Sequence, residues 1–112
     1  MRRAAAGNEM TYAIVMTTCE GPENAKLIAK NLIERRLAAC VQLLPIESYF
    51  TWEGELQNAQ ELLLLCKTKS GAFQDVEALI RKLHTYTTPE IVQVPIERGS
   101  KAYLDWISSM TR

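Results

Sequence analysis

The sequence predicts a single α+β domain in which helices cover an antiparallel sheet. Two observations support this prediction: β-prone apolar runs alternate with stretches whose apolar residues recur at helical spacing. The chain of 112 residues is 47% apolar and 23% charged, which is typical of one globular domain. We expect residues 10–112 to form this domain and residues 1–9 to be a frayed or disordered tail.

The first half of the domain is expected to begin with a strand and a helix. Residues 10–18 are nearly all apolar, as in a central strand that is covered on both faces. Pro22 suits the first position of a helix. The apolar stripe of that helix consists of Ala25, Ile28, Ala29, Leu32 and Ile33. A second apolar run, residues 37–44, ends at Pro45, which predicts a bulge or an edge position there.

The second half is expected to complete a long hairpin and add two helices. A tight turn at residues 53–55 predicts that the flanking strands form one hairpin over about residues 38–68. Ser70 is expected to cap a second helix that ends near His84, and residues 91–96 to form a short edge strand. A last helix begins at Ser100. The order βαββαβ followed by α is the ferredoxin-like arrangement, a four-stranded antiparallel sheet with two helices on one face.

The distal half of the predicted hairpin is too apolar to remain in solvent. It carries Tyr49, Phe50, Trp52 and Leu56. An exposed two-stranded ribbon with such side chains would promote aggregation. We therefore expect other copies of the chain to bury these four residues.

Charge and cysteine content exclude several classes of protein. Thirteen basic and thirteen acidic residues cancel, which argues against nucleic-acid binding and against electrostatic docking on a membrane. No run of 18 apolar residues is present. The three cysteines are irregularly spaced, so we expect free thiols and a reducing compartment. Cys19, at a strand–helix junction, is expected to react before Cys40 and Cys66.

His84, the only histidine, is the first candidate for a functional site. Composition favours a partner of the helix dipole or a satisfied polar group. A metal ligand is the alternative, because Glu90 follows across the turn and an imidazole–carboxylate pair suits Cu(II) or Zn(II). A third ligand would then come from elsewhere in the chain or from a neighbouring subunit. No nucleophile or phosphate-binding motif is present, so we expect no catalysis.

Several segments form a specific set when they are taken in order along the chain. They are Gly21-Pro22-Glu23, Leu37-Ala38-Ala39-Cys40-Val41, residues 49–56, Cys66-Lys67-Thr68 and residues 84–91. From about Tyr12 to Trp106 the chain resembles the CutA divalent-cation-tolerance family. The resemblance implies a ferredoxin-like protomer in a homotrimer, with hairpins wrapped around neighbours. It also implies a cytoplasmic protein linked to tolerance of copper and other divalent cations.

The resemblance also implies metal ligands. In the family, copper ligation is attributed to a Cys at the end of the first strand and to the His and Glu of an H-P-Y-x-T-P-E stretch, which fall here on His84 and Glu90. Thr17 occupies the Cys position and Thr85 replaces the Pro. Cys19, two residues beyond Thr17, is the candidate replacement, because alternate strand residues share a face. The alternative to a metal-binding protein is a trimeric signalling or scaffold module that binds a small molecule or a partner protein.

Overall fold

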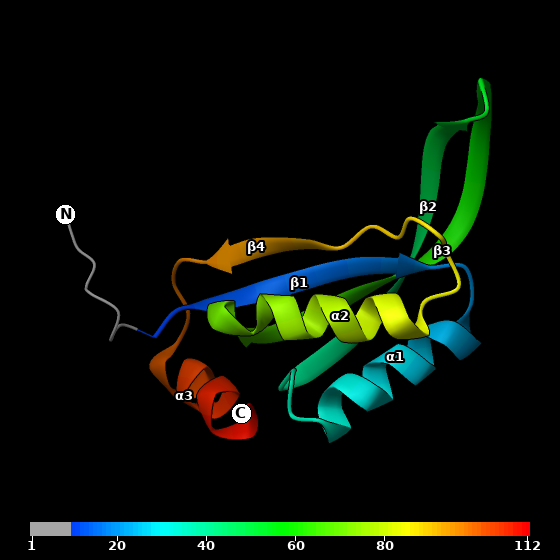
Figure 1. The fold of residues 1–112 in the computed structure, drawn as a ribbon. Coiled ribbons are helices and arrows are strands. Elements are labelled where there is room, and N and C mark those ends of the chain that lie inside the picture. The colour runs from blue at the N-terminus through cyan, green and yellow to red at the C-terminus, as the bar shows by residue number, and fades with distance from the viewer. Residues whose placement is uncertain (1–9) are drawn as a thin grey trace.

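The fold has the predicted order of strands and helices. The structure, a computed structural model, describes residues 10–112, so the tail expected at residues 1–9 lies outside the described part. The elements are β1 (Tyr12–Cys19), α1 (Pro22–Glu34), β2 (Cys40–Trp52), β3 (Glu55–Lys69), η1 (Ser70–Ala72), α2 (Phe73–Leu83), β4 (Val92–Ile96) and α3 (Lys101–Met110). Figure 1 shows them along the chain.

The four strands form one antiparallel sheet in the order β2-β3-β1-β4, with α1 and α2 packed on one face (Figure 1). The core between helices and sheet consists chiefly of Val15, Cys19, Ala25, Ile28, Leu32, Leu64, Cys66, Val76, Leu79 and Ile80. Residues of β1 alternate between buried and half-buried. The expectation that both faces of β1 are covered is therefore correct for the helix face only, since no helix within residues 10–112 runs along the other face.

The helix α3 docks at the end of the sheet that lies away from the hairpin (Figure 1). Arg36, in the turn after α1, has a positive φ of 58°. Its guanidinium donates hydrogen bonds to the carbonyls of Ser109 and Met110, at 2.9 and 3.3 Å. Its own carbonyl accepts the Arg112 N–H at 3.0 Å. These bonds satisfy carbonyls that the end of a helix leaves free, and they hold α3 against the turn.

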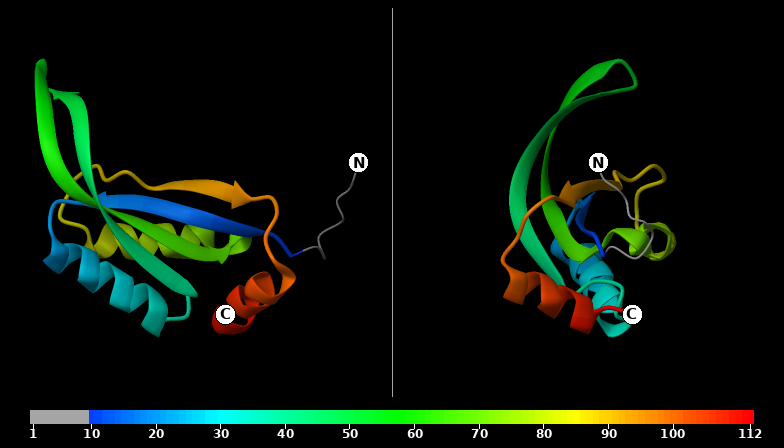
Figure 2. Two further views of the ribbon diagram at one scale, coloured as in Figure 1. Left: turned by 180° about the vertical axis from the view of Figure 1, so that it is seen from behind. Right: turned by 90° about the vertical axis from the view of Figure 1, so that its left-hand side faces the viewer.

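The strands β2 and β3 form the predicted long hairpin. Their register runs without interruption from the pair Cys40–Lys67 to the pair Trp52–Glu55. The alternative of a bulge at Pro45 is therefore wrong, and the alternative of an edge position is correct, since β2 is an edge strand. β1 ends at Cys19, opposite Leu62. Beyond that pair the hairpin continues as a two-stranded ribbon that curves away from the sheet (Figure 2).

Local predictions at the ends of helices gave mixed results. Ser70 does not cap α2: it begins the short 3₁₀ turn η1, and α2 starts three residues later with no side-chain cap. Ser100 does cap α3, because its hydroxyl accepts the Tyr103 N–H at 3.4 Å. His84 lies directly after α2 with extended backbone, not in the last helical turn. Among the described residues, no helix has both the length and the apolar character needed to cross a membrane.

Candidate metal centre

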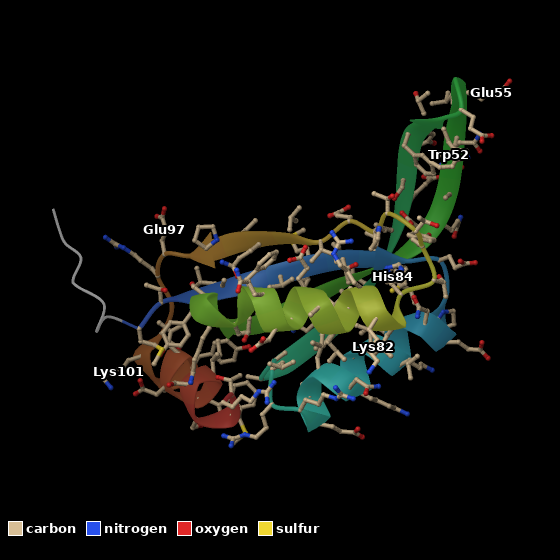
Figure 3. All side chains as sticks on the ribbon, viewed as in Figure 1. Trp52, Glu55, Lys82, His84, Glu97 and Lys101 are labelled. Atoms are coloured by element: carbon tan, nitrogen blue, oxygen red, sulfur yellow. The ribbon has the colours of Figure 1, made fainter. Side chains whose placement is uncertain are left out.

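The predicted ligands come from segments that meet where β1 ends. Cys19 is the last residue of β1, His84 follows α2 directly, and Glu90 lies in the segment between α2 and β4. Figure 3 shows His84 where α2 ends, near the base of the hairpin. The split βαβ arrangement accounts for this meeting, because α2 runs along the sheet and ends at the carboxyl end of β1.

Cys19 and His84 are brought into contact. Strand alternation places Cys19 on the buried face of β1 with Val15 and Thr17, all of them 0% exposed. The Cys19 Sγ lies 3.8 Å from the Nε2 of His84. In a tetrahedral zinc site with Zn–S of about 2.3 Å and Zn–N of about 2.0 Å, the sulfur and nitrogen atoms lie about 3.5 Å apart. The observed 3.8 Å is slightly longer than this spacing.

Burial controls the reactivity of the cysteines, all three of which are free. Burial raises the pKa of Cys19 to about 11, and the nearby Glu61 carboxylate adds to this. Burial likewise raises the pKa of Cys66 to about 12. Cys40 is only half-buried. The expectation that Cys19 reacts first is therefore contradicted: it lies at the strand–helix junction, but its side chain points into the core.

Both ring nitrogens of His84 have hydrogen-bond partners. Nε2 donates to the carbonyl of Thr18 at 2.8 Å, and Nδ1 accepts the backbone N–H of Tyr86 at 3.0 Å. These two bonds require a neutral ring with its hydrogen on Nε2. His84 is thus the satisfied polar group that composition favours. That role leaves the metal hypothesis open, because the Nε2 atom also faces the Cys19 sulfur.

A second polar cluster beside this pair is not predicted by the sequence analysis. The Tyr86 hydroxyl donates to Glu61 at 2.7 Å, and the Ser48 hydroxyl donates to the other oxygen of the same carboxylate at 2.7 Å. Burial, followed by the bond to Glu61, raises the pKa of Tyr86. The only local signal is that Glu61 is the last charged residue before the apolar run 62–65.

Glu90 is exposed and does not join Cys19 and His84. In residues 10–112, no three His, Cys, Asp or Glu side chains lie close enough together to hold a metal ion. Within one described chain, Cys19 and His84 are therefore in contact, and Glu90 lies apart from them.

Two buried polar atoms belong to the elements around this pair. The Oγ1 of Thr17, on β1, and the Oδ1 of Asn24, on α1, have no hydrogen-bond partner among the described residues. Asn24 uses its Nδ2 to donate to the Leu83 carbonyl at 2.9 Å, which ties the end of α2 to α1 and helps to place His84.

A family model for the CutA1 divalent ion tolerance protein matches residues 13–110 of the chain. The divalent-cation tolerance protein CutA of Archaeoglobus fulgidus is 46% identical over 96 residues, which cover 86% of this chain and 94% of that protein. The protein of the same name from Thermus thermophilus is 46% identical over 99 residues, which cover 88% and 96%.

Solved structures show the same fold. The structure of an Archaeoglobus fulgidus protein, named a periplasmic divalent cation tolerance protein CutA, has a TM-score of 0.86 at 43% identity and covers 88% of this chain and 97% of its own. CutA1 from rice, Oryza sativa, has a TM-score of 0.88 at 35% identity and covers 91% and 94%. These matches confirm the resemblance and the fold predicted from the sequence.

Proposed function

The chain belongs to the CutA1 family of divalent ion tolerance proteins, and from this membership we propose that it binds a divalent cation, copper or another, without catalysis. The observation that carries the proposal is the 3.8 Å contact between the Cys19 sulfur and the His84 Nε2 atom. A thiolate together with an imidazole is a donor set suited to copper and zinc. The ion would replace the thiol proton of Cys19.

The third ligand in this proposal is Glu90. Its carboxylate is exposed, four residues beyond Tyr86 in the segment that also carries His84. The segment between α2 and β4 would have to bring Glu90 toward His84 when the ion binds. Thr17, the family Cys position, is buried on the same face of β1 as Cys19.

We further propose that the protein is a homotrimer and acts in the cytoplasm. In the ladder, Tyr49 and Leu56 lie on one face of the distal hairpin, while Phe50 and Trp52 lie on the other. Tyr49, Trp52 and Leu56 are 67%, 62% and 78% exposed. Because both faces of the distal hairpin carry apolar side chains, both must be shielded from water. This supports a hairpin that packs between other copies of the chain. The free thiols support a reducing compartment.

Calorimetric titration with Zn(II) and with Cu(II) tests the metal site. We expect His84→Ala and Cys19→Ser each to weaken binding by tenfold or more, and Glu90→Gln to weaken it less, because the change removes the charge and keeps the shape. Cys40→Ser is the matched control, since it removes a thiol outside the pair and should leave the affinity unchanged. Thr17→Cys should strengthen copper binding, because it adds a soft ligand at the family position.

If neither His84→Ala nor Cys19→Ser changes the affinity for Zn(II) or Cu(II), the metal proposal is overturned. The trimeric scaffold that binds a small molecule or a partner protein would then be the better hypothesis. Circular dichroism of each variant establishes that a loss of binding is not a loss of fold.

A further inference from the structure

We infer that α3 is a strap that opens from the end of the sheet while the rest of the domain stays folded, and that Arg36 holds this strap closed against a cavity. The inference does not depend on the proposed metal site. It concerns the end of the sheet that lies away from the hairpin (Figure 1).

The helix α3 buries little of its own surface. Ile107 is the one buried residue within Lys101–Met110, and it is not part of the core cluster that the described residues form between helices and sheet. Tyr103, Trp106 and Met110 are 38%, 39% and 45% exposed. An element with so few buried apolar contacts opens at a lower free energy than the whole domain.

Hydrogen bonds attach the C-terminal end of α3, and most of them involve Arg36. The Arg36 guanidinium donates to two carbonyls in the last turn of the helix, and the Arg36 carbonyl accepts the Arg112 N–H. A further bond runs from the Lys69 ammonium to the Thr111 carbonyl, at 3.3 Å. Arg36 is therefore the clasp of the strap.

The backbone of Arg36 indicates that the turn after α1 does not itself favour an arginine. The N–H of Arg36 donates to the Ile33 carbonyl at 3.0 Å, and the N–H of Leu37 donates to the Leu32 carbonyl at 2.9 Å. This pattern ends a helix with one left-handed residue, most often glycine. Arg36 has that left-handed backbone, with a φ of 58°, which disfavours any side chain. What the arginine adds is its pair of bonds to α3.

The end of α3 also borders a cavity of about 390 Å³. Leu37, Lys69, Asp75 and Arg112 are among the residues that line it. When the strap opens, Arg112 leaves the wall of the cavity and the Lys69 ammonium loses the Thr111 carbonyl. Opening of α3 therefore exposes the cavity to solvent.

Native-state hydrogen exchange tests whether α3 opens by itself. In the unaltered protein, we expect the amides of α3 to exchange about tenfold faster than the slowest amides of β1, or faster still. Their exchange should respond weakly to low concentrations of urea, because a local opening exposes little surface. If the amides of α3 exchange as slowly as those of β1 and respond to urea equally, α3 opens only with the whole domain and the inference is overturned.

Two substitutions of Arg36 separate the clasp from the strained backbone. Arg36→Ala removes the guanidinium and keeps the strain, so it should speed exchange in both α3 and β1 by about fivefold, the effect of one ordinary hydrogen bond. Arg36→Gly removes both, so it should speed α3 by about the same factor and leave β1 nearly unchanged, because the relieved strain offsets the lost bonds. Arg35→Ala, at the adjacent exposed arginine, is the matched control and should leave α3 unchanged.

Thiol labelling of Leu37→Cys tests access to the cavity. Leu37 is 3% exposed, so iodoacetamide should reach a thiol at this position only when the cavity opens. Adding Arg36→Gly should speed this labelling by about fivefold, as it does the exchange of α3. The buried Cys66 is the internal control, and its labelling should not change. Equal labelling with and without Arg36→Gly would show that the strap does not close the cavity, and unchanged exchange of α3 in Arg36→Gly would show that Arg36 is not its clasp. Either result overturns the inference.

Discussion

Thr17 and Thr68 are fully buried threonines of the sheet that differ in one hydrogen bond. Thr68 donates to the Leu37 carbonyl at 2.7 Å, while the Thr17 hydroxyl has no partner among the described residues. A buried hydroxyl without a partner costs free energy, and removal of a bonded one leaves its partner unsatisfied. We expect Thr17→Val to raise the free energy of unfolding by about 1 kcal/mol and Thr68→Val to lower it by about 1–3 kcal/mol.

Urea denaturation of the two variants measures both changes. The substitution is the same at both positions, so a difference in sign isolates the hydrogen bond from the change of side-chain shape. A loss of stability in Thr17→Val comparable to that in Thr68→Val would show that the Thr17 hydroxyl has a partner after all.

The thiols also differ at the residue scale. Alkylation requires the thiolate, and the folded protein holds the pKa of Cys19 at about 11 and that of Cys66 at about 12, above the ordinary 9.0. Near neutral pH we expect iodoacetamide to modify Cys40 first. Labelling of Cys19 and Cys66 should increase as the pH rises toward these values. Mass spectrometry of peptides after short labelling times gives the order, and early modification of Cys19 would contradict the buried thiol.

At the scale of elements, Ser100 and Ser70 offer a direct comparison, because both were expected at the start of a helix. Only Ser100 accepts a backbone N–H of its helix. We expect Ser100→Ala to lower the free energy of unfolding by about 0.5–1 kcal/mol, toward the low end for a cap because the bond is long, and Ser70→Ala to change it little. Thermal unfolding of the two variants side by side checks this. Equal losses of stability in the two variants would mean that both serines cap their helices.

The order of the elements could be predicted because each has a clear hydrophobic period, and the register of the hairpin follows from the turn at Gly54. The start of α2 could not be predicted, because a serine suits a 3₁₀ turn as well as a helix cap. The regular ladder at Pro45 could not be predicted either, because a proline suits a bulge as well as an edge strand.

The candidate site likewise combines features that the sequence predicts with features that it does not. The family resemblance together with strand alternation makes Cys19 a candidate neighbour of His84, and in the structure its sulfur lies 3.8 Å from the His84 Nε2 atom. The bond from Tyr86 to Glu61 joins residues 25 positions apart, and no local pattern reports it. Contacts of that kind depend on how far the hairpin extends past β1, which is a property of the folded chain.

At the scale of the whole molecule, the protomer is more extended than its length requires. Its radius of gyration is 15.3 Å and its extents are 46 × 32 × 23 Å, whereas a compact domain of this size has a radius near 13 Å. The hairpin causes the difference (Figure 2). Trp52 and Glu55 lie at its far end, away from the rest of the domain (Figure 3). A projecting ribbon with apolar side chains on both faces is stable in water only if something covers it.

The last prediction concerns this cover. Sedimentation equilibrium at micromolar concentration should give about three times 12.7 kDa. Trp52→Asp should shift the protein toward monomers, because it places an unpaired charge where the partner copies exclude water. Trp52→Phe, the control, keeps an apolar ring and should remain trimeric. A protein that is a soluble monomer at every concentration would contradict the trimer. If Trp52→Asp remains trimeric, the contacts between copies lie elsewhere. The open face of the sheet, which includes the exposed residues Leu44, Val92 and Val94, would then be the next surface to alter.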